Sequence, residues 1–294
     1  MKKILFFFAL LLLGVGAMEA QEVRRLGKPA VAKNPIRIVY FLEGVEENDL
    51  ERWYGIVVAV HDSLMAQPVF KEHEDAFEAV ALLTPSKQSG VTYRDSTKVR
   101  DTYFGSYFET SNYLKLPEWG ENKLTVTRTH LYPDFDKNRD ITVVLVNDPR
   151  FAGRFGGWSN FAIVTYNKPL DALGVIHEIG HHFGLADERY FSYYPTLNPF
   201  PRYPNLIKLT TEEQKSVTRD QVLWGKLIEP STPLPTPWDW EKYHANIGLF
   251  PVTLRDGIEY FTSQMDCIMR SSSTQFFCAA CRLHIGQELE HRLA

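Results

Sequence analysis

The hydrophobic residues of the chain fall into strand-like runs and helix-like spacings. Residues 36–43, IRIVYFLE, are β-branched and aromatic, and residues 77–83, FEAVALL, are similarly apolar. Both runs predict buried strands. Between them, apolar residues recur at helical spacing up to about Ala66, after a capping box formed by Asn48 and Glu51. A strand, a helix and a strand in this order predict a βαβ unit with a parallel sheet.

The rest of the chain predicts further elements separated by irregular regions. Strands are predicted at 141–147 and 161–167, on either side of a Gly-rich loop at 153–157, and helices at 171–183 and 275–293. Residues 84–122 show no sustained period and predict a long surface loop with short elements. Residues 195–240 are rich in proline and predict an irregular covering region. The fold class is therefore α/β.

The first twenty residues have the layout of a secretory signal peptide. Two lysines precede an apolar run from Ile4 to Leu13, and small residues follow up to Ala20. The run is shorter than the ~20 residues of a membrane span. We therefore expect cleavage after Ala17 or Ala20 and an exported protein, secreted, periplasmic or at the cell surface; a retained N-terminal anchor is the alternative. Residues 21–34 are expected to form a linker.

Composition excludes some partners. The chain has 294 residues, is 44% hydrophobic and 13% aromatic, and carries a net charge of -4. This composition is that of a folded protein with a large core. The sequence has no basic stripe that would bind nucleic acid and no polybasic patch that would bind a membrane surface.

The stretch HEIGHHFGLADE at 177–188 has the spacing of a zinc site. His177 and His181 are four residues apart, so on a helix they differ by ~40° of rotation and share one face. His182 lies about 140° from His177 and is a poor ligand for the same ion. Gly184 allows the helix to end and the chain to bring Asp187 back as the third ligand, which leaves a fourth position for water.

Glu178 has the position of a general base in this motif. It would take a proton from the zinc-bound water and pass it to the leaving amine of a peptide bond. Three alternatives stay open: Glu188 or a carboxylate on a later helix as third ligand, a zinc ion without catalysis, and a helix whose histidines are incidental.

Several sequence blocks resemble a known family. They are PSKQSGV at 85–91, FGSYF at 104–108, VLVNDPRFAGRFGG at 144–157, HEIGHHFGLADE at 177–188, IGLF at 247–250 and CIMRSSSTQFFCAAC at 267–281. In this order they resemble the IgA-peptidase family of secreted bacterial zinc metallopeptidases, within the metzincin clan. Residues 251–265 depart from the family pattern.

The resemblance implies a metzincin-like catalytic domain over residues 35–294, with subdomains 35–184 and 185–294. It implies a twisted, mostly parallel sheet ahead of the active-site helix, and an irregular C-terminal part. Met269 would form the Met-turn beneath the metal. FAIVTYN at 161–167 would be the edge strand along which an extended substrate adds.

The cysteines and two polar clusters complete the expectations. Cys267, Cys278 and Cys281 are too few for a four-cysteine zinc site, and in an exported protein a disulfide from Cys267 to one of the other two is expected. Asp134 to Asp140 has the alternating acids of a calcium loop but lacks its glycine and terminal glutamate, which favours a polar turn. A tyrosine hydroxyl from Tyr190, Tyr193 or Tyr194 would suit an oxyanion-stabilising role.

Two functions are consistent with these patterns. The first is an exported zinc endopeptidase that hydrolyses a polypeptide substrate. The alternative is a zinc-stabilised, non-catalytic module that binds a host or cell-surface protein or glycan. The two differ in whether Glu178 is needed.

Overall fold

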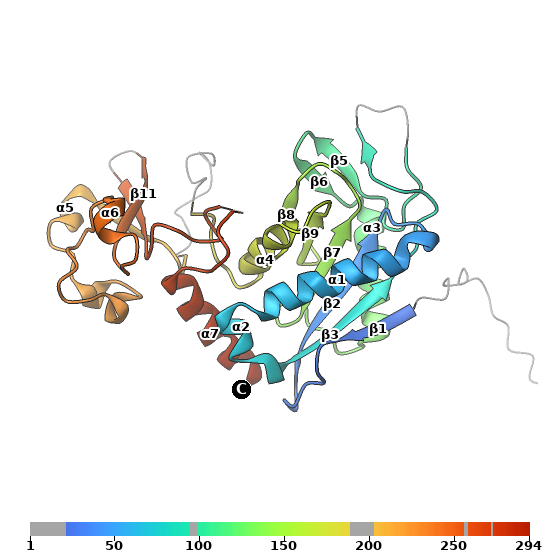
Figure 1. Cartoon of the computed structure of the whole chain (residues 1–294), viewed down its shortest axis with the longest axis horizontal. Helices are drawn as coiled ribbons and strands as arrows, with labels where there is room; N and C mark the ends of the chain where they lie inside the picture. The colour runs from blue at the N-terminus through green and yellow to red at the C-terminus, as the bar shows by residue number, and fades with distance from the viewer. Residues whose placement is uncertain (1–21, 95–98, 189–202, 256–257, 272) are drawn as a thin grey trace, which may run out of the picture.

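The computed structural model describes residues 22–94, 99–188, 203–255, 258–271 and 273–294 (Figure 1). The predicted signal peptide at 1–20 lies outside these residues. The three tyrosines considered for the oxyanion, Tyr190, Tyr193 and Tyr194, lie outside them as well.

A six-stranded mixed sheet forms the centre of the N-terminal part. Its strand order is β1-β3-β2-β7-β9-β8. The four inner strands run parallel, while β1 and β8 pair antiparallel at the two edges. The strands are β1 (Glu22–Leu26), β2 (Ile36–Glu43), β3 (Phe77–Leu83), β7 (Ile141–Val146), β8 (Gly153–Gly156) and β9 (Phe161–Thr165).

The predicted βαβ unit is confirmed. Strands β2 and β3 pair in parallel, with Ile36 opposite Phe77. The crossover contains α1 (Leu50–Met65), the short α2 (Pro68–Lys71) and the single turn η2 (Glu74–Ala76). The predicted capping box is wrong, because Asn48 lies within the 3-10 turn η1 (Glu47–Asp49), and the residue before α1 is Asp49.

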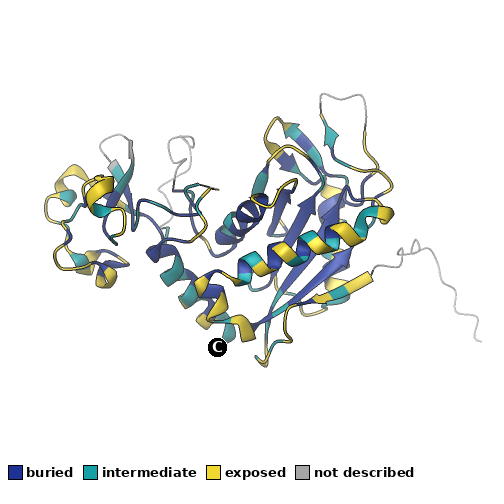
Figure 2. Cartoon of the chain, viewed as in Figure 1, coloured by how far each residue is buried: buried dark blue, intermediate teal, exposed yellow. Residues whose placement is uncertain are grey.

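The sheet separates two hydrophobic layers because its side chains alternate between faces. In β2, Ile36, Ile38, Tyr40 and Leu42 join the larger core on the side of α1, whereas Val39 and Phe41 join the smaller core on the other side. Every residue of β7 is buried. Figure 2 shows the inner strands buried and the outer face of α1 exposed. A continuously apolar run is what a parallel strand covered on both faces requires.

The smaller core is covered by elements that begin within residues 84–122, the region predicted as a surface loop. These are α3 (Glu118–Leu131) and a three-stranded sheet of β4 (Thr92–Tyr93), β5 (Tyr107–Thr110) and β6 (Tyr113–Lys115). Helix α3 was not predicted because its buried face is mostly polar: it carries Glu121, Thr127 and Arg128 beside Leu124. Hydrophobic spacing cannot reveal such a helix.

The predicted linker at 21–34 contains the edge strand β1. All five of its residues pair with β3, from Glu22 opposite Leu83 to Leu26 opposite Ala79. Only Leu26 of this strand is buried. A single buried residue gives too little pattern to identify a strand from sequence.

The C-terminal part consists of a small antiparallel sheet, short helices and one long helix (Figure 1). The sheet order is β10-β12-β11, and the hairpin of β11 and β12 occupies most of the segment that departs from the family pattern. The elements are β10 (Ile207–Thr210), α5 (Thr211–Gln214), η4 (Arg219–Gln221), η5 (Gly225–Leu227), α6 (Trp240–Tyr243), β11 (Phe250–Arg255), β12 (Ile258–Thr262) and α7 (Ala279–Leu293).

Helix α7 joins the two parts of the molecule. It begins at Ala279 rather than at the predicted Gln275, because Cys278 is extended and precedes the first turn. His284 lies 2.8 Å through Nε2 from the carbonyl of Phe183, and Arg292 donates to the carbonyl of His182. None of the helices in the described part of the chain has both the length and the apolar character of a membrane span.

His61 on α1 gives a prediction for the pH dependence of stability. Its ring is 4% exposed and lies 3.3 Å through Nδ1 from the hydroxyl of Tyr40. Burial lowers the pKa of His61, with Asp62 opposing this shift weakly. As pH falls below about 6.5, His61 therefore takes up a proton in the unfolded chain before it does so in the folded chain.

The contribution of His61 to stability is thus present above about pH 6.5 and is lost as pH falls. The free energy of unfolding should decrease by at most about 1.4 kcal/mol per pH unit from this residue. We expect the free energy of unfolding of His61→Gln, measured in urea, to fall less than that of wild type between about pH 7 and pH 5. His130→Gln, on the exposed surface of α3, is the matched control. Equal slopes for wild type and His61→Gln would contradict this account.

Candidate metal centre and its base

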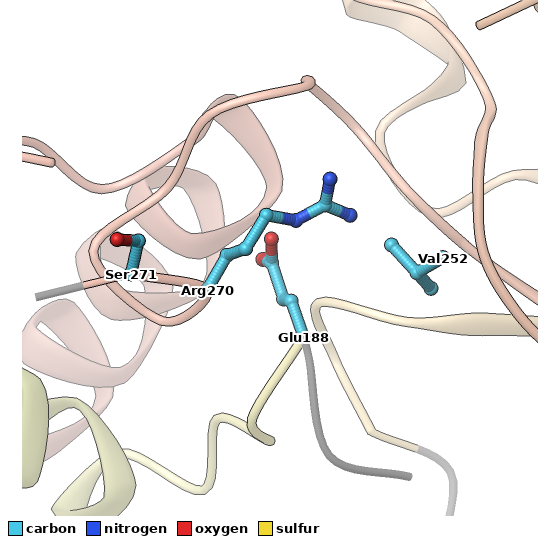
Figure 3. Close-up of a pocket in the computed structure, with 4 residues that line it drawn as sticks. All are labelled: Glu188, Val252, Arg270 and Ser271. Carbon is cyan, nitrogen blue, oxygen red and sulfur yellow. The ribbon is translucent and has the colours of Figure 1, made fainter. Parts of the chain in front are cut away.

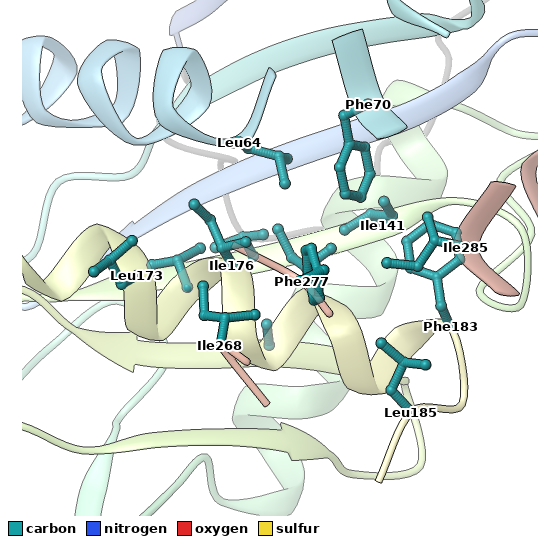
Figure 4. Close-up of a cluster of buried hydrophobic side chains, with 14 of the residues drawn as sticks. Leu64, Phe70, Ile141, Leu173, Ile176, Phe183, Leu185, Ile268, Phe277 and Ile285 are labelled. Atoms are coloured by element: carbon teal, nitrogen blue, oxygen red, sulfur yellow. The ribbon is translucent and has the colours of Figure 1, made fainter. Parts of the chain in front are cut away.

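Helix α4 (Asp171–His182) is buried except for two partly exposed histidines, His177 and His181. Their rings meet edge to face with centroids 4.9 Å apart. Figure 4 shows why the helix is buried: side chains from α1, α2, β7 and α7 pack around it together with Ile268 and Phe277. Two imidazoles on the one open face of a buried helix are placed to share a ligand.

The chain turns back toward these histidines after the helix. Gly184 has φ +77°, a conformation that glycine adopts without strain, and the amide of Leu185 donates to the carbonyl of Gly180. This reversal brings Oδ1 of Asp187 to 3.0 Å from Nε2 of His177 and 3.6 Å from Nε2 of His181. The three predicted ligands are therefore brought together.

Backbone carbonyls fix the orientation of both imidazoles. Nδ1 of His177 lies 2.9 Å from the carbonyl oxygen of Ile268, and Nδ1 of His181 lies 2.8 Å from that of Leu185. If each Nδ1 carries the proton and donates it, each Nε2 can offer its lone pair to an ion that Asp187 also binds. Metal-binding histidines are held in this way by their second ring nitrogen. The sequence did not predict the carbonyl of Ile268, because it lies 91 residues beyond His177.

Glu178 lies next to these ligands in a closely packed setting. It is 7% exposed, and its carboxylate faces strand β8. The backbone amide of Phe155 interacts with it and favours its charged form. Burial nevertheless raises the pKa of Glu178 to about 7, although His177 opposes this shift. A carboxylate with this pKa is suited to exchange protons near neutrality.

Comparison with known protein families identifies the chain. The sequence model of the family described as IgA Peptidase M64 matches residues 31–255, which include β2 through β11 and the whole of HEIGHHFGLADE. The chain belongs to this family. It is therefore a peptidase from a metallopeptidase family, and a peptidase acts on a polypeptide. No curated protein was found to match the chain.

The three convergent side chains of this peptidase fit a metal ion. Each offers one donor atom, and the three donor atoms lie within 4.8 Å of one another. Burial lowers the pKa of His181, as does the neighbouring His177. Burial opposes ionisation of both His177 and Asp187, but the hydrogen bond between them prevails, raising the pKa of His177 to about 9 and lowering that of Asp187. Two imidazoles and a carboxylate are donors that zinc accepts.

The other polar residues of the motif face elsewhere. The ring of His182 is buried against Phe155, with centroids 5.7 Å apart. Burial lowers the pKa of His182 to about 3, and Arg292 adds to this effect. Glu188, considered as an alternative third ligand, is directed toward Cys278 and Cys281.

The strand beside Glu178 is β8, which corrects the prediction for 161–167. That segment forms β9, which is an inner strand between β7 and β8. The edge is the Gly-rich stretch at 153–156, predicted as a loop. Glycine is depleted in strands, so the sequence gives little signal there. Gly153 leaves room in β8 for Glu178, because a Cβ at this position would lie 2.7 Å from Oε1 of Glu178 and would displace its carboxylate.

We expect Gly153→Ala to lower kcat by about 10²-fold, because the added methyl group displaces the carboxylate of Glu178 and displacements of about 1 Å have this cost. Metal content, measured by mass spectrometry, should not change. Gly55→Ala on α1 is the matched control, since its added Cβ meets nothing within 4 Å. A Gly153→Ala enzyme with wild-type kcat would show that Glu178 is not held against β8.

Met269 packs against α4 at Gly180, in a turn of residues 267–270. The amide of Arg270 donates to the carbonyl of Cys267, and the sulfur of Met269 is fully buried. Gly180 of α4 allows this approach, because a Cβ there would lie 2.5 Å from the sulfur. The turn therefore packs directly against the helix between the two histidines.

The acidic cluster at 134–140 is paired with arginines. Asp140 is buried and accepts from the amide of Arg37 and the guanidinium of Arg139, while Asp134 pairs with Arg37 at 2.9 Å. The three thiols are free and lie together with Glu188. No disulfide joins Cys267 to Cys278 or Cys281 in this structure.

Proposed function

We propose that this peptidase is an exported zinc-dependent endopeptidase of the metzincin type. The observation that supports this most strongly is the convergence of His177, His181 and Asp187 beside the buried carboxylate of Glu178. A site with three protein ligands leaves a position open, as in catalytic rather than structural zinc centres.

Each residue of the site has a separate role in this proposal. His177 and His181 would hold the ion through Nε2, and Asp187 would hold it through Oδ1. Bound zinc would supply Lewis acidity, which activates water and polarises the scissile carbonyl. Glu178 accepts the proton of the attacking water on its carboxylate and then delivers it to the nitrogen of the leaving amine. Because burial raises the pKa of Glu178 to about 7, its carboxylate can take up and release a proton near neutral pH.

The turn at 267–270 would serve as the Met-turn of the clan. Its carbonyl at Ile268 orients His177, and Met269 supports α4 at Gly180. Substrate would lie extended along β8, the edge strand next to Glu178, and would be recognised through its main chain. This placement replaces the one predicted along 161–167.

The signal-like segment at 1–20 supports export, which would place the enzyme outside the cytoplasm with extracellular or periplasmic polypeptides as substrates. Cleavage-site profiling on a diverse peptide library tests the activity. We expect internal bonds to be cut by the zinc-loaded chain and no cleavage after chelation. Release of terminal residues alone would contradict an endopeptidase.

A further inference from the structure

A second cluster of metal-ligating side chains lies apart from the histidines. Cys267, Cys278, Cys281 and Glu188 are all buried, and one donor atom from each lies within 4.8 Å of the others. They come from three segments: the end of HEIGHHFGLADE, the turn under α4 and the start of α7. None of the four has a role in the proposed hydrolysis.

We propose that Cys267, Cys278, Cys281 and Glu188 form a second, structural metal site that binds zinc. Three cysteines are too few for a four-cysteine centre, but the carboxylate of Glu188 completes a set of four donors. Closed sets of four are typical of structural zinc, whereas catalytic zinc keeps a position open.

Four of the six distances between the donor atoms are close to those of a tetrahedron around zinc. With Zn–S bonds of about 2.3 Å, the sulfurs of a tetrahedral site lie about 3.8 Å apart, and a sulfur and an oxygen about 3.6 Å. Sγ of Cys281 lies 3.7 Å from Sγ of Cys267 and 3.4 Å from Sγ of Cys278. Oε1 of Glu188 lies 3.3 Å from Sγ of Cys278 and 3.5 Å from Sγ of Cys281.

A cation also explains why a carboxylate is buried among thiols. Glu188 is 2% exposed, and its Oε2 has no hydrogen-bond partner within the described part of the chain. A buried carboxylate is costly unless it is paired or binds a metal. A disulfide between Cys267 and Cys281 would leave this carboxylate and the thiol of Cys278 without an ion to bind.

Backbone and side-chain groups hold the proposed ligands in place. Cys278 precedes the first turn of α7 and Cys281 lies within it, so both residues lie at the positive end of the helix dipole. The backbone amide of Cys278 donates to Sγ of Cys267 at 3.2 Å. Asn205 fixes Glu188 from the other side, through a bond of 3.3 Å to Oε1.

An opening leads to this cluster. Glu188 lines a pocket of about 310 Å³ together with Val252, Arg270 and Ser271 (Figure 3). The same side chain therefore contacts both the pocket and the thiols, and gives an ion a path to the buried site. Arg270 lines the same pocket beside Glu188, and its positive charge offsets part of the negative charge of the ligands.

The second site would support the first through the chain itself. Glu188 follows Asp187 directly, and Cys267 precedes Ile268, whose carbonyl orients His177. The amide of Glu188 donates to the carbonyl of Met269 at 2.9 Å. An ion at the cysteines would thus tie α7 and the turn at 267–270 to the segment that carries Asp187.

Metal counting on the full chain tests this inference independently of the proposed function. We expect wild type to bind two zinc ions per chain, and the variant His177→Ala with His181→Ala to bind one. Cobalt loaded into that variant should show the intense near-ultraviolet absorption of thiolate-to-cobalt charge transfer. The cysteines are unaltered in it, so the spectrum does not depend on whether a cysteine variant folds.

Cys278→Ser with Cys281→Ser should lose one of the two ions and keep the other at the histidines. The inference is overturned if the histidine variant binds no zinc, or if its cobalt spectrum shows no thiolate ligands. It is also overturned if the unreduced, denatured chain has lost the mass of two hydrogens, because that result shows a disulfide.

Discussion

Replacing Glu178 with glutamine is expected to lower kcat by about 10²- to 10⁴-fold while the chain keeps its zinc. Glutamine preserves the volume of this buried side chain, which is 7% exposed and packed against Gly153. Its amide cannot accept a proton from water, so the loss falls on the chemical step. The measurement is kcat on a peptide that the wild type cleaves, with metal content determined on the same sample.

Glu118→Gln is the matched control for this experiment, since Glu118 is exposed on the first turn of α3. It makes the same chemical change far from the site and should leave kcat at the wild-type value. A Glu178→Gln protein with unchanged turnover would rule out the proposed base. A non-catalytic binding module would likewise show no dependence on Glu178.

Replacing Asp187 with alanine is expected to weaken zinc binding at the histidines by more than about 100-fold. Loss of a residue that only supports a ligand costs roughly 10- to 100-fold in metal affinity, and loss of a ligand itself should cost more. Asp187 supplies Oδ1 at 3.0 Å from Nε2 of His177, and without it only two donors remain. The measurement is the zinc affinity of the first site by competition with a chelator. Activity should fall in parallel and recover partly at high zinc.

Asp101→Ala changes an exposed aspartate on the surface and serves as the control. The cysteine cluster should keep its own ion in Asp187→Ala, so total zinc should fall by one ion and not by two. Wild-type affinity in Asp187→Ala would show that the third ligand is another group.

The sequence predicts the elements whose buried side chains are mostly apolar. Strands β2, β3, β7 and β9 are mostly apolar, because a parallel sheet covered on both faces buries the side chains of both faces. Helix α4 was predicted to within one residue. The spacing of its histidines, with Gly184 and Asp187, was enough to predict which side chains converge.

The elements that were missed depend on contacts between distant segments. Gly153 of strand β8 lies against the carboxylate of Glu178, and this contact cannot be inferred before the fold is known. Helix α3 buries polar residues, and β1 buries only Leu26. In the cluster of Glu188 with three cysteines, Glu188 contacts Cys278 and Cys281, which lie 90 and 93 positions further along the chain.

Zinc reconstitution of the metal-free chain, followed by turnover on a library-derived peptide, tests the central claim most directly. We predict that cleavage is absent without metal, returns as the histidine site fills, and stays absent in Glu178→Gln at equal zinc content. A chain that carries zinc at His177, His181 and Asp187 and still cleaves no peptide of a diverse library would contradict the account.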